Sequence, residues 1–440
     1  MPPIHDRAAV VSVGDELILG QTVDTNSAAI SARLSSWGIR VVEHVTVPDD
    51  LAAQRSALER VAESGVPLII VTGGLGPTAD DLTRQALALA MGDHLVADDA
   101  ALAALEAMFT RRGRALTELQ KTQAQRPSRA ACIPNPHGTA PGLFGTIKLE
   151  SGDCDVFCLP GPPNEMTPML EDWVRPRLRP PAGVAVRTRV LHTLGAGEGD
   201  LAVRLGALMD RDRNPLVGTT ASGGVVSIRI RYEGPGADAD AAIELTERAC
   251  RDACAPFVFG EENDTIASAT LDELRRNAAK LCVIESCTGG MLGSLLTAVP
   301  GSSDVFVGGW ITYDNSVKSA LVGVPGATLA SHGAVSRETA LAMARGGLER
   351  AKSFGATNAI SITGVAGPGG GSDAKPVGTV HIACVSDGPG GGFEHARRFR
   401  FTGDRAAVRD RSAKSALAML RFALRGERVE RLLWEVPSGG

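Results

Sequence analysis

Twice in this chain an apolar stretch runs directly into a turn of the form Thr-Gly-x-x-Gly-Pro. Residues 67–72 (PLIIVT) lead into TGGLGP at 72–77, and residues 358–363 (NAISIT) lead into TGVAGP at 363–368. An apolar run bounded by glycine and proline is typical of a buried strand of a parallel sheet. Because open α/β sheets bind ligands beyond the carboxyl ends of their strands, we expect the chemistry of this chain at these turns.

The composition restricts the function further. A length of 440 residues suggests about three domains, and 44% apolar with 22% charged residues excludes general disorder. The net charge is −5, whereas a dedicated nucleic-acid binder is expected to be basic. We expect neither a secretory signal nor a membrane span. Eight cysteines without zinc spacing predict reduced, buried thiols in a cytoplasmic protein.

Strand and helix patterns alternate over residues 1–172, which predicts a parallel α/β sheet with helices on both faces. The glycines of the loop at 73–76 could let backbone N–H groups approach a phosphate, or could simply make a tight turn. Asp80 and Asp81 could cap the following helix, or hold a divalent metal that bridges to phosphate oxygens. The residues alone leave both interpretations open.

Residues 173–258 begin with a proline-rich linker and then show a strand, a helix, two strands and a helix. This order predicts a small α+β module. Its segment at 195–200 (GAGEGD) is acidic and lacks the GXXG spacing with which a KH module clamps RNA. We therefore favour a role in packing or in supporting a dimer over RNA binding.

Residues 262–430 predict a third α/β domain with a candidate hydrolytic set. Ser303 follows a Pro-Gly turn, Tyr313 ends the next strand, and Lys318 lies one turn into the helix after it. A serine hydroxyl becomes nucleophilic when a neighbouring base takes its proton, and a desolvated lysine can be that base. The alternatives are a helix cap, a core tyrosine and a solvated lysine. Cys287, at a helix start, is a rival nucleophile.

The first domain resembles the amino-terminal domain of the CinA family (competence/damage-inducible proteins), itself similar to molybdopterin-binding domains. The matching segments are GDELILGQTVDTN (14–26), VPDD (47–50), TGGLGPTADDLT (72–83), NPHGTAPG (135–142) and LPGPPNEM (159–166). The resemblance implies an ADP-ribose pyrophosphatase that forms AMP and ribose 5-phosphate, with a divalent metal (Mg²⁺, Mn²⁺ or Co²⁺) and K⁺ as cofactors. It places Asp49 and Asp81 in the active site. Together with the glycine loop, we expect nucleotide or phosphate binding by Asn26, Asp49, Gly73, Gly74, Gly76 and Asp81, and metal binding by Glu16, Asp80 and Asp81.

The last domain resembles the CinA carboxy-terminal domain, and the middle segment its KH-like domain. The segments are ESCTGG (285–290), VPGSS (299–303), GGWITYDNSVK (308–318), LVGV (321–324), HGAVS (332–336), ITGVAGPGGG (362–371), KPVGTV (375–380) and FTGDR (401–405). The resemblance implies hydrolysis of nicotinamide mononucleotide (NMN) to nicotinate mononucleotide and ammonia, without a cofactor. Ser303 would be the nucleophile, activated by Tyr313 and Lys318. The substrate would be positioned by Ser286, Thr363, Gly364 and Arg405.

The sequence thus predicts a three-domain hydrolase of pyridine-nucleotide salvage that acts on NMN and ADP-ribose and forms a homodimer. Two alternatives stay open. The first domain could bind or adenylylate molybdopterin. The chain could instead be a non-catalytic competence or recombination adaptor, although its acidic charge and missing GXXG loop disfavour nucleic-acid binding.

Overall fold

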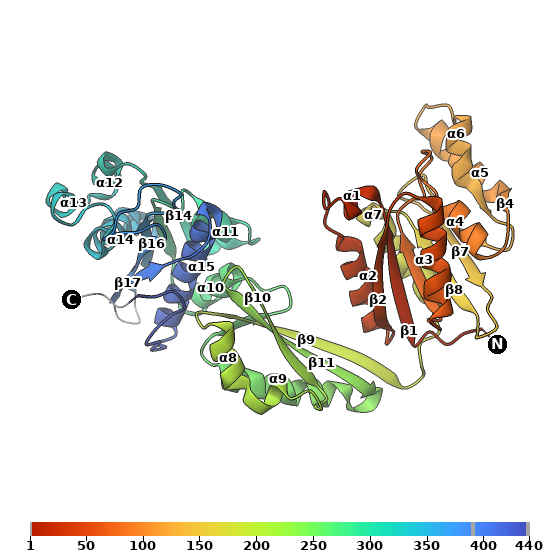
Figure 1. Ribbon diagram of the computed structural model, residues 1–440. Coiled ribbons are helices and arrows are strands. Elements are labelled where there is room, and N and C mark those ends of the chain that lie inside the picture. The colour runs from red at the N-terminus through yellow and green to blue at the C-terminus, as the bar shows by residue number, and fades with distance from the viewer. Residues whose placement is uncertain (1, 389–391, 437–440) are drawn as a thin grey trace. The chain divides into compact units, whose positions relative to one another are not determined.

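The computed structural model describes residues 2–388 and 392–436 (Figure 1). The chain divides into two compact units. The first comprises Met1–Arg187 and Tyr232–Ala241, and the second comprises Thr188–Arg231 and Ala242–Gly440. Within the described ranges, none of the helices has the length and apolar character that crossing a membrane requires.

The first unit is built on a six-stranded sheet. Its strands, in spatial order, are β2 (Arg40–Val47), β1 (Arg7–Val13), β3 (Leu68–Thr72), β8 (Cys154–Leu159), β7 (Gly142–Ile147) and β6 (Ala131–Ile133). The first four are parallel, as the sequence predicts, but β7 runs antiparallel to both of its neighbours, β8 and β6. The short β7–β8 connection explains the difference, because a parallel pair needs a long crossover.

Helices cover both faces of this sheet, which the alternating side chains of β1 show. Ala9 and Val11 pack on one face in a cluster with α3 (Leu51–Glu63) and α4 (Thr83–Ala90), and Ala8 and Val10 pack on the other with α2 (Thr25–Ser36) and α7 (Pro163–Met169). A short ribbon of two strands stands apart. The remaining elements are α1 (Asp15–Ile18), β4 (Leu95–Ala97), α5 (Asp99–Arg111), α6 (Glu118–Lys121) and β5 (Gln125–Pro127).

A second sheet has the strand order β10-β11-β9-β12. Its elements follow the chain as β9 (Val184–Leu194), α8 (Glu198–Leu205), β10 (Leu216–Ser222), β11 (Val225–Pro235), α9 (Ala239–Cys254) and β12 (Val258–Glu261). Ser222 pairs with Val225 across Gly223-Gly224, so β10 and β11 form a hairpin. The predicted α+β order is therefore correct.

The third sheet has the order β14-β13-β15-β16-β17. Strands β13 (Leu281–Glu285), β14 (Phe306–Ile311) and β15 (Asn358–Gly364) are parallel, and β16 (Thr379–Ser386) and β17 (Phe393–Arg400) form an antiparallel pair. The helices are α10 (Ile266–Arg276), α11 (Met291–Thr297), α12 (Asn315–Val322), α13 (Gly326–His332), α14 (Arg337–Ala351) and α15 (Arg405–Leu424). Helix α14 packs on one face of this sheet, and α15 packs on the other. The contact of Cys384 Sγ with the Ala416 carbonyl oxygen of α15, at 4.0 Å, shows this second packing.

Candidate functional site

The carboxyl ends of the parallel strands β13, β14 and β15 bring a buried lysine to a serine. Lys318 Nζ lies 3.2 Å from Ser286 Oγ, 2.9 Å from the Thr312 carbonyl oxygen and 3.0 Å from the Tyr313 carbonyl oxygen. Asp314 caps α12 by accepting from the Ser316 N–H, so Lys318 sits in the first turn of that helix, directly after β14. Only 1% of Lys318 is exposed, and this burial lowers its pKa.

The partners of Lys318 define what its amine can do. A neutral amine has two N–H groups and one lone pair, and the two carbonyl oxygens can only accept hydrogen bonds. The carbonyl groups of Thr312 and Tyr313 therefore take both N–H groups. In this neutral form the lone pair is left to face the Ser286 oxygen, to which the protonated amine donates at 3.2 Å. This is the geometry of a general base beside a nucleophile.

The structure does not bring Ser303 to this pair, which corrects the expected catalytic set. Ser303 is an exposed residue of a 3₁₀ turn (Ser302–Asp304) that precedes β14. Tyr313 and Lys318 follow the opposite end of that strand. Six strand residues span about 20 Å, so the Ser303 hydroxyl lies far from the Lys318 amine.

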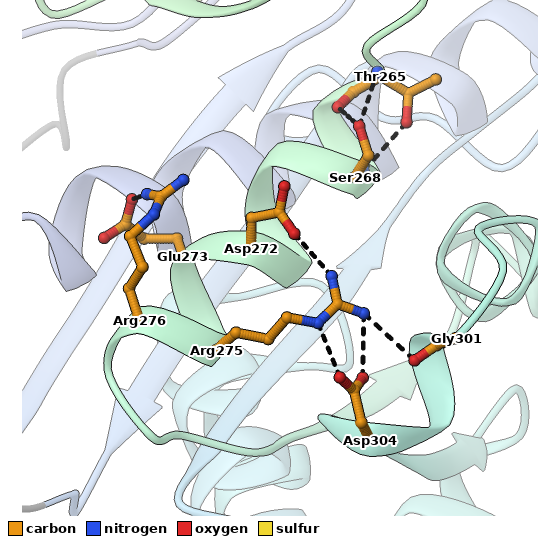
Figure 2. Close-up of polar contacts among 8 residues, drawn as sticks. All are labelled: Thr265, Ser268, Asp272, Glu273, Arg275, Arg276, Gly301 and Asp304. Carbon is orange, nitrogen blue, oxygen red and sulfur yellow. Dashed lines mark hydrogen bonds and ion pairs between the residues drawn. The ribbon is translucent and has the colours of Figure 1, made fainter.

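Figure 2 shows how Arg275 holds the turn that contains Gly301 and Asp304. Arg275 of α10 donates from Nε and Nη2 to the two carboxylate oxygens of Asp304, at 2.7 and 3.0 Å, and from Nη2 to the Gly301 carbonyl at 3.2 Å. Asp272 accepts a further bond from Arg275 Nη1 at 2.6 Å. The turn is a structural clamp onto α10.

The other expected residues of this domain do lie at the strand ends. The Ser286 N–H donates to the Ile362 carbonyl at 2.9 Å, which places Ser286 beside Thr363, whose hydroxyl donates to the Ala334 carbonyl at 2.7 Å. Gly364 ends β15. Arg405 donates to the Tyr313 phenol oxygen at 3.2 Å and to the Gly367 carbonyl at 2.7 Å.

Cys287, the rival nucleophile, is disfavoured by its environment. Its side chain is buried, and burial raises the pKa of the thiol to about 12. The thiolate, which is the reactive form, is therefore scarce near neutral pH.

Glu285 is a residue of this site that the sequence analysis missed. Its carboxylate is 1% exposed. It accepts the N–H groups of Gly290 at 3.0 Å, Leu292 at 3.0 Å and Gly293 at 2.8 Å. Glu285 thereby fastens the start of α11 to the end of β13 and shapes the turn that begins with Ser286. Its place immediately before the Ser-Cys-Thr-Gly-Gly turn was the available signal.

Replacing Glu285 with alanine should lower the free energy of unfolding by about 3 kcal/mol, because three backbone donors lose a charged acceptor. Urea denaturation measures the loss. The exposed Glu63 at the end of α3 provides the control variant Glu63→Ala, which should differ little from wild type. A Glu285→Ala protein as stable as this control would disprove the anchoring role.

In the first unit, a pocket of about 370 Å³ lies at the glycine loop and is lined by Glu16, Asp49 and Asp80 among others. Asp49 and Asp15 hold each other, since each side chain accepts the other residue's backbone N–H at 3.0 and 3.2 Å. Burial raises the pKa of Asp49, and the charges of Asp15, Glu16 and Asp80 raise it further. The pocket thus has a negative electrostatic potential.

Asp81 supports the glycine loop rather than standing free. Its Oδ1 accepts the Gly76 N–H at 2.7 Å, and its Oδ2 accepts the Thr78 N–H at 2.8 Å and the Thr78 hydroxyl at 2.5 Å. A Cβ at Gly76 would lie 2.3 Å from Asp81 Oδ2, so the loop needs glycine there. Asp81 therefore positions the glycine loop, and its expected role as a metal ligand stays a prediction.

The remaining loop residues also have structural partners. Asn26 donates to the Thr72 hydroxyl at 3.0 Å and to the Gly161 carbonyl at 2.7 Å, and so joins α2 to two of the loops. Gly73 and Gly74 have positive φ values of 103° and 65° and line the pocket with Gly76. The other expected residues therefore line one pocket. Asn26 does not line it but connects the segments that do.

The carboxylates of this pocket fit a divalent cation that is shared with a ligand. Within the described ranges, no group of three or more His, Cys, Asp or Glu residues is placed to hold a metal by itself. Mg²⁺ is usually held by one or two carboxylates together with substrate phosphates. Glu16, Asp49 and Asp80 are the pocket carboxylates that could take this part.

The fold and the two strand-edge sites define a multidomain α/β protein with sites of the kind that enzymes use. Three family patterns match it: "Probable molybdopterin binding domain" over residues 9–180, "Damage-inducible protein CinA KH domain" over 188–260 and "CinA C-terminal domain" over 263–424. A CinA-like protein of Gemmatimonas aurantiaca is 41% identical over 428 residues, which cover 95% of this chain and 96% of the relative. The chain belongs to the CinA family.

A second relative supports the same family. A putative competence-damage inducible protein of Symbiobacterium thermophilum is 40% identical over 428 residues, covering 95% of this chain and 99% of the relative. A solved structure, that of competence/damage inducible protein CihA from Agrobacterium tumefaciens, is 39% identical, with a TM-score of 0.33. The match covers 36% of this chain and 93% of that protein.

Proposed function

We propose that the carboxy-terminal domain hydrolyses the carboxamide of NMN to nicotinate mononucleotide and ammonia. The observation that carries the proposal is the buried Lys318 amine, whose two carbonyl partners leave its lone pair for Ser286. The segments that resemble the family's amidohydrolase domain supply the substrate class. Ser286 takes the nucleophile's role that the sequence assigned to Ser303.

The reaction proceeds in two steps at one pair of residues. Ser286 Oγ attacks the carboxamide carbon while Lys318 Nζ accepts the hydroxyl proton. The tetrahedral intermediate collapses as the Lys318 ammonium returns that proton to the leaving nitrogen, which departs as ammonia. Water then attacks the resulting ester on Ser286, with Lys318 again accepting a proton. As the ester bond breaks, the Lys318 ammonium returns that proton to Ser286 Oγ, and nicotinate mononucleotide leaves.

Arg405 is suited to hold the substrate's phosphate. Its guanidinium is fixed by the Gly367 carbonyl and the Tyr313 phenol oxygen, and a guanidinium has five N–H donors in all. The remaining donors can bind a phosphate group. Tyr313 therefore acts twice, since its carbonyl positions Lys318 and its phenol positions Arg405.

The proposal is tested by incubating the full-length protein with NMN and measuring ammonia together with nicotinate mononucleotide. We expect the two products in equal amounts. Nicotinamide riboside, which lacks the phosphate, should react far more slowly if Arg405 binds that group. If NMN yields neither product, the proposed function is wrong.

For the amino-terminal domain we propose hydrolysis of the pyrophosphate of ADP-ribose to AMP and ribose 5-phosphate. The acidic pocket at the glycine loop supports it, because a diphosphate could enter only with a cation. A divalent cation, when bound, would neutralise the charge on the diphosphate. AMP formation with Mg²⁺ or Co²⁺ tests the proposal, and binding of molybdopterin without AMP formation would favour the alternative.

A further inference from the structure

A buried arginine without an anionic partner lies in the second unit, away from the strand-edge site. Arg421 of α15 is 5% exposed. Its Nη2 donates to the Val258 carbonyl at 3.1 Å. Within the described ranges, its guanidinium forms no ion pair with a carboxylate. A buried charge that lacks a counter-charge is costly, so this arrangement needs an explanation.

Arg421 lines a pocket of about 330 Å³ together with three further arginines. Arg251 lies on α9 and Arg276 on α10, and Arg425 is the C-cap residue of α15. Phe259 and other apolar side chains complete the wall, and no Asp or Glu belongs to the described lining. Four guanidinium groups therefore surround one small volume.

The three other arginines already have carboxylate partners outside the lining. Figure 2 shows Arg276 paired with Glu273 on α10. Arg251 pairs with Glu247 at 2.7 Å and also with Glu261, and Arg425 lies 3.8 Å from Glu427. These partners fix the positions of the three guanidinium groups. Arg421 alone keeps a charge that no side chain in contact neutralises.

The electrostatics of Arg421 agree with this geometry. Burial lowers the pKa of Arg421 to about 10, and the charges of Arg425 and Arg276 add to the effect, while Glu273 and Glu427 oppose it. At neutral pH the guanidinium therefore still carries its proton. An anion in the pocket would both replace the lost hydration of Arg421 and relieve its repulsion from the neighbouring arginines.

We propose that this pocket binds a small phosphate-bearing anion, inorganic phosphate or a phosphate monoester. The planar fork of a guanidinium matches phosphate oxygens, and a cavity of about 330 Å³ is large enough for a phosphate group with a small substituent. The bound anion ties α9, β12, α10 and α15 together and so stabilises the second unit. This site is separate from Ser286 and Lys318.

The test is the thermal unfolding midpoint of the full-length protein, together with calorimetric titration, against inorganic phosphate at constant ionic strength. The midpoint of the wild type should rise with phosphate concentration, as mass action requires of a ligand that binds only the folded state. Arg276→Gln and Arg425→Gln should each weaken phosphate binding by about tenfold. Arg248→Gln, at an exposed residue of α9 outside the lining, should bind phosphate as the wild type does.

A third variant separates binding from folding. Arg421→Met should lose the phosphate response but keep at least the wild-type midpoint in phosphate-free buffer, because it removes the uncompensated buried charge. If all three pocket variants respond to phosphate like the wild type, binding occurs elsewhere and the proposal is overturned. A wild type that does not respond to phosphate overturns it as well.

Discussion

Ser286→Ala should lower kcat for NMN hydrolysis by about 10⁴-fold or more, because the variant has no hydroxyl to attack the carboxamide or to carry the acyl group. The substituted side chain is small and lies at a strand end, so the fold should be unchanged. Ammonia release under saturating NMN measures the effect. Circular dichroism and the thermal midpoint establish that the variant is folded.

The matched control for this experiment is Ser303→Ala. Ser303 is exposed in the turn that Arg275 holds. This turn lies at the opposite end of β14 from Lys318. The variant should therefore hydrolyse NMN at close to the wild-type rate. The reverse pattern, with Ser303→Ala inactive and Ser286→Ala active, would refute the assignment of the nucleophile.

Lys318→Arg should be as inactive as Lys318→Met, with each losing about 10²- to 10⁴-fold in kcat. Arginine keeps a positive charge but does not release its proton, so it cannot serve as a base. If the amine acted only through its charge, Lys318→Arg would retain most of the activity. The two variants thus distinguish proton transfer from electrostatic stabilisation.

The same base predicts a pH dependence. Burial lowers the pKa of Lys318 below its usual value of 10.5, and only the neutral amine accepts the serine proton. The rate should therefore rise with pH through the lowered pKa and then level off. Residual hydrolysis by Lys318→Met should lack this rise, and a wild-type rate that falls over that interval would contradict the mechanism.

The free energy of unfolding should also rise with pH over this interval. Between the lowered folded pKa and 10.5 the unfolded chain binds more protons at Lys318 than the folded chain does, so the free energy of unfolding rises with pH in that interval. Lys318→Met should lack this contribution. Urea denaturation at several pH values in both proteins measures the difference.

Local sequence patterns were enough to predict most of the fold. Apolar runs that end in glycine gave β3 and β15, and the pairing of Ser222 with Val225 follows from the Gly-Gly turn between two alternating strands. These patterns are reliable because they depend on the period of the side chains and on turn chemistry, which act over a few residues. These patterns did not predict the antiparallel strand β7 of the first sheet, because the direction of a strand depends on which strands it pairs with.

The candidate sites could likewise be predicted only in part from the sequence. Glycines, the strand-end threonine and the lysine after β14 could be found because their residue types and their places after strands are written in the chain. The sequence could not show which hydroxyl meets the Lys318 amine, because Ser286 and Ser303 both lie in plausible turns. That choice depends on strand direction, since the carboxyl ends of β13 and β14 meet at one edge while the turn before β14 lies at the other. The buried charge of Arg421 likewise arises only when helices distant in sequence pack together and exclude water.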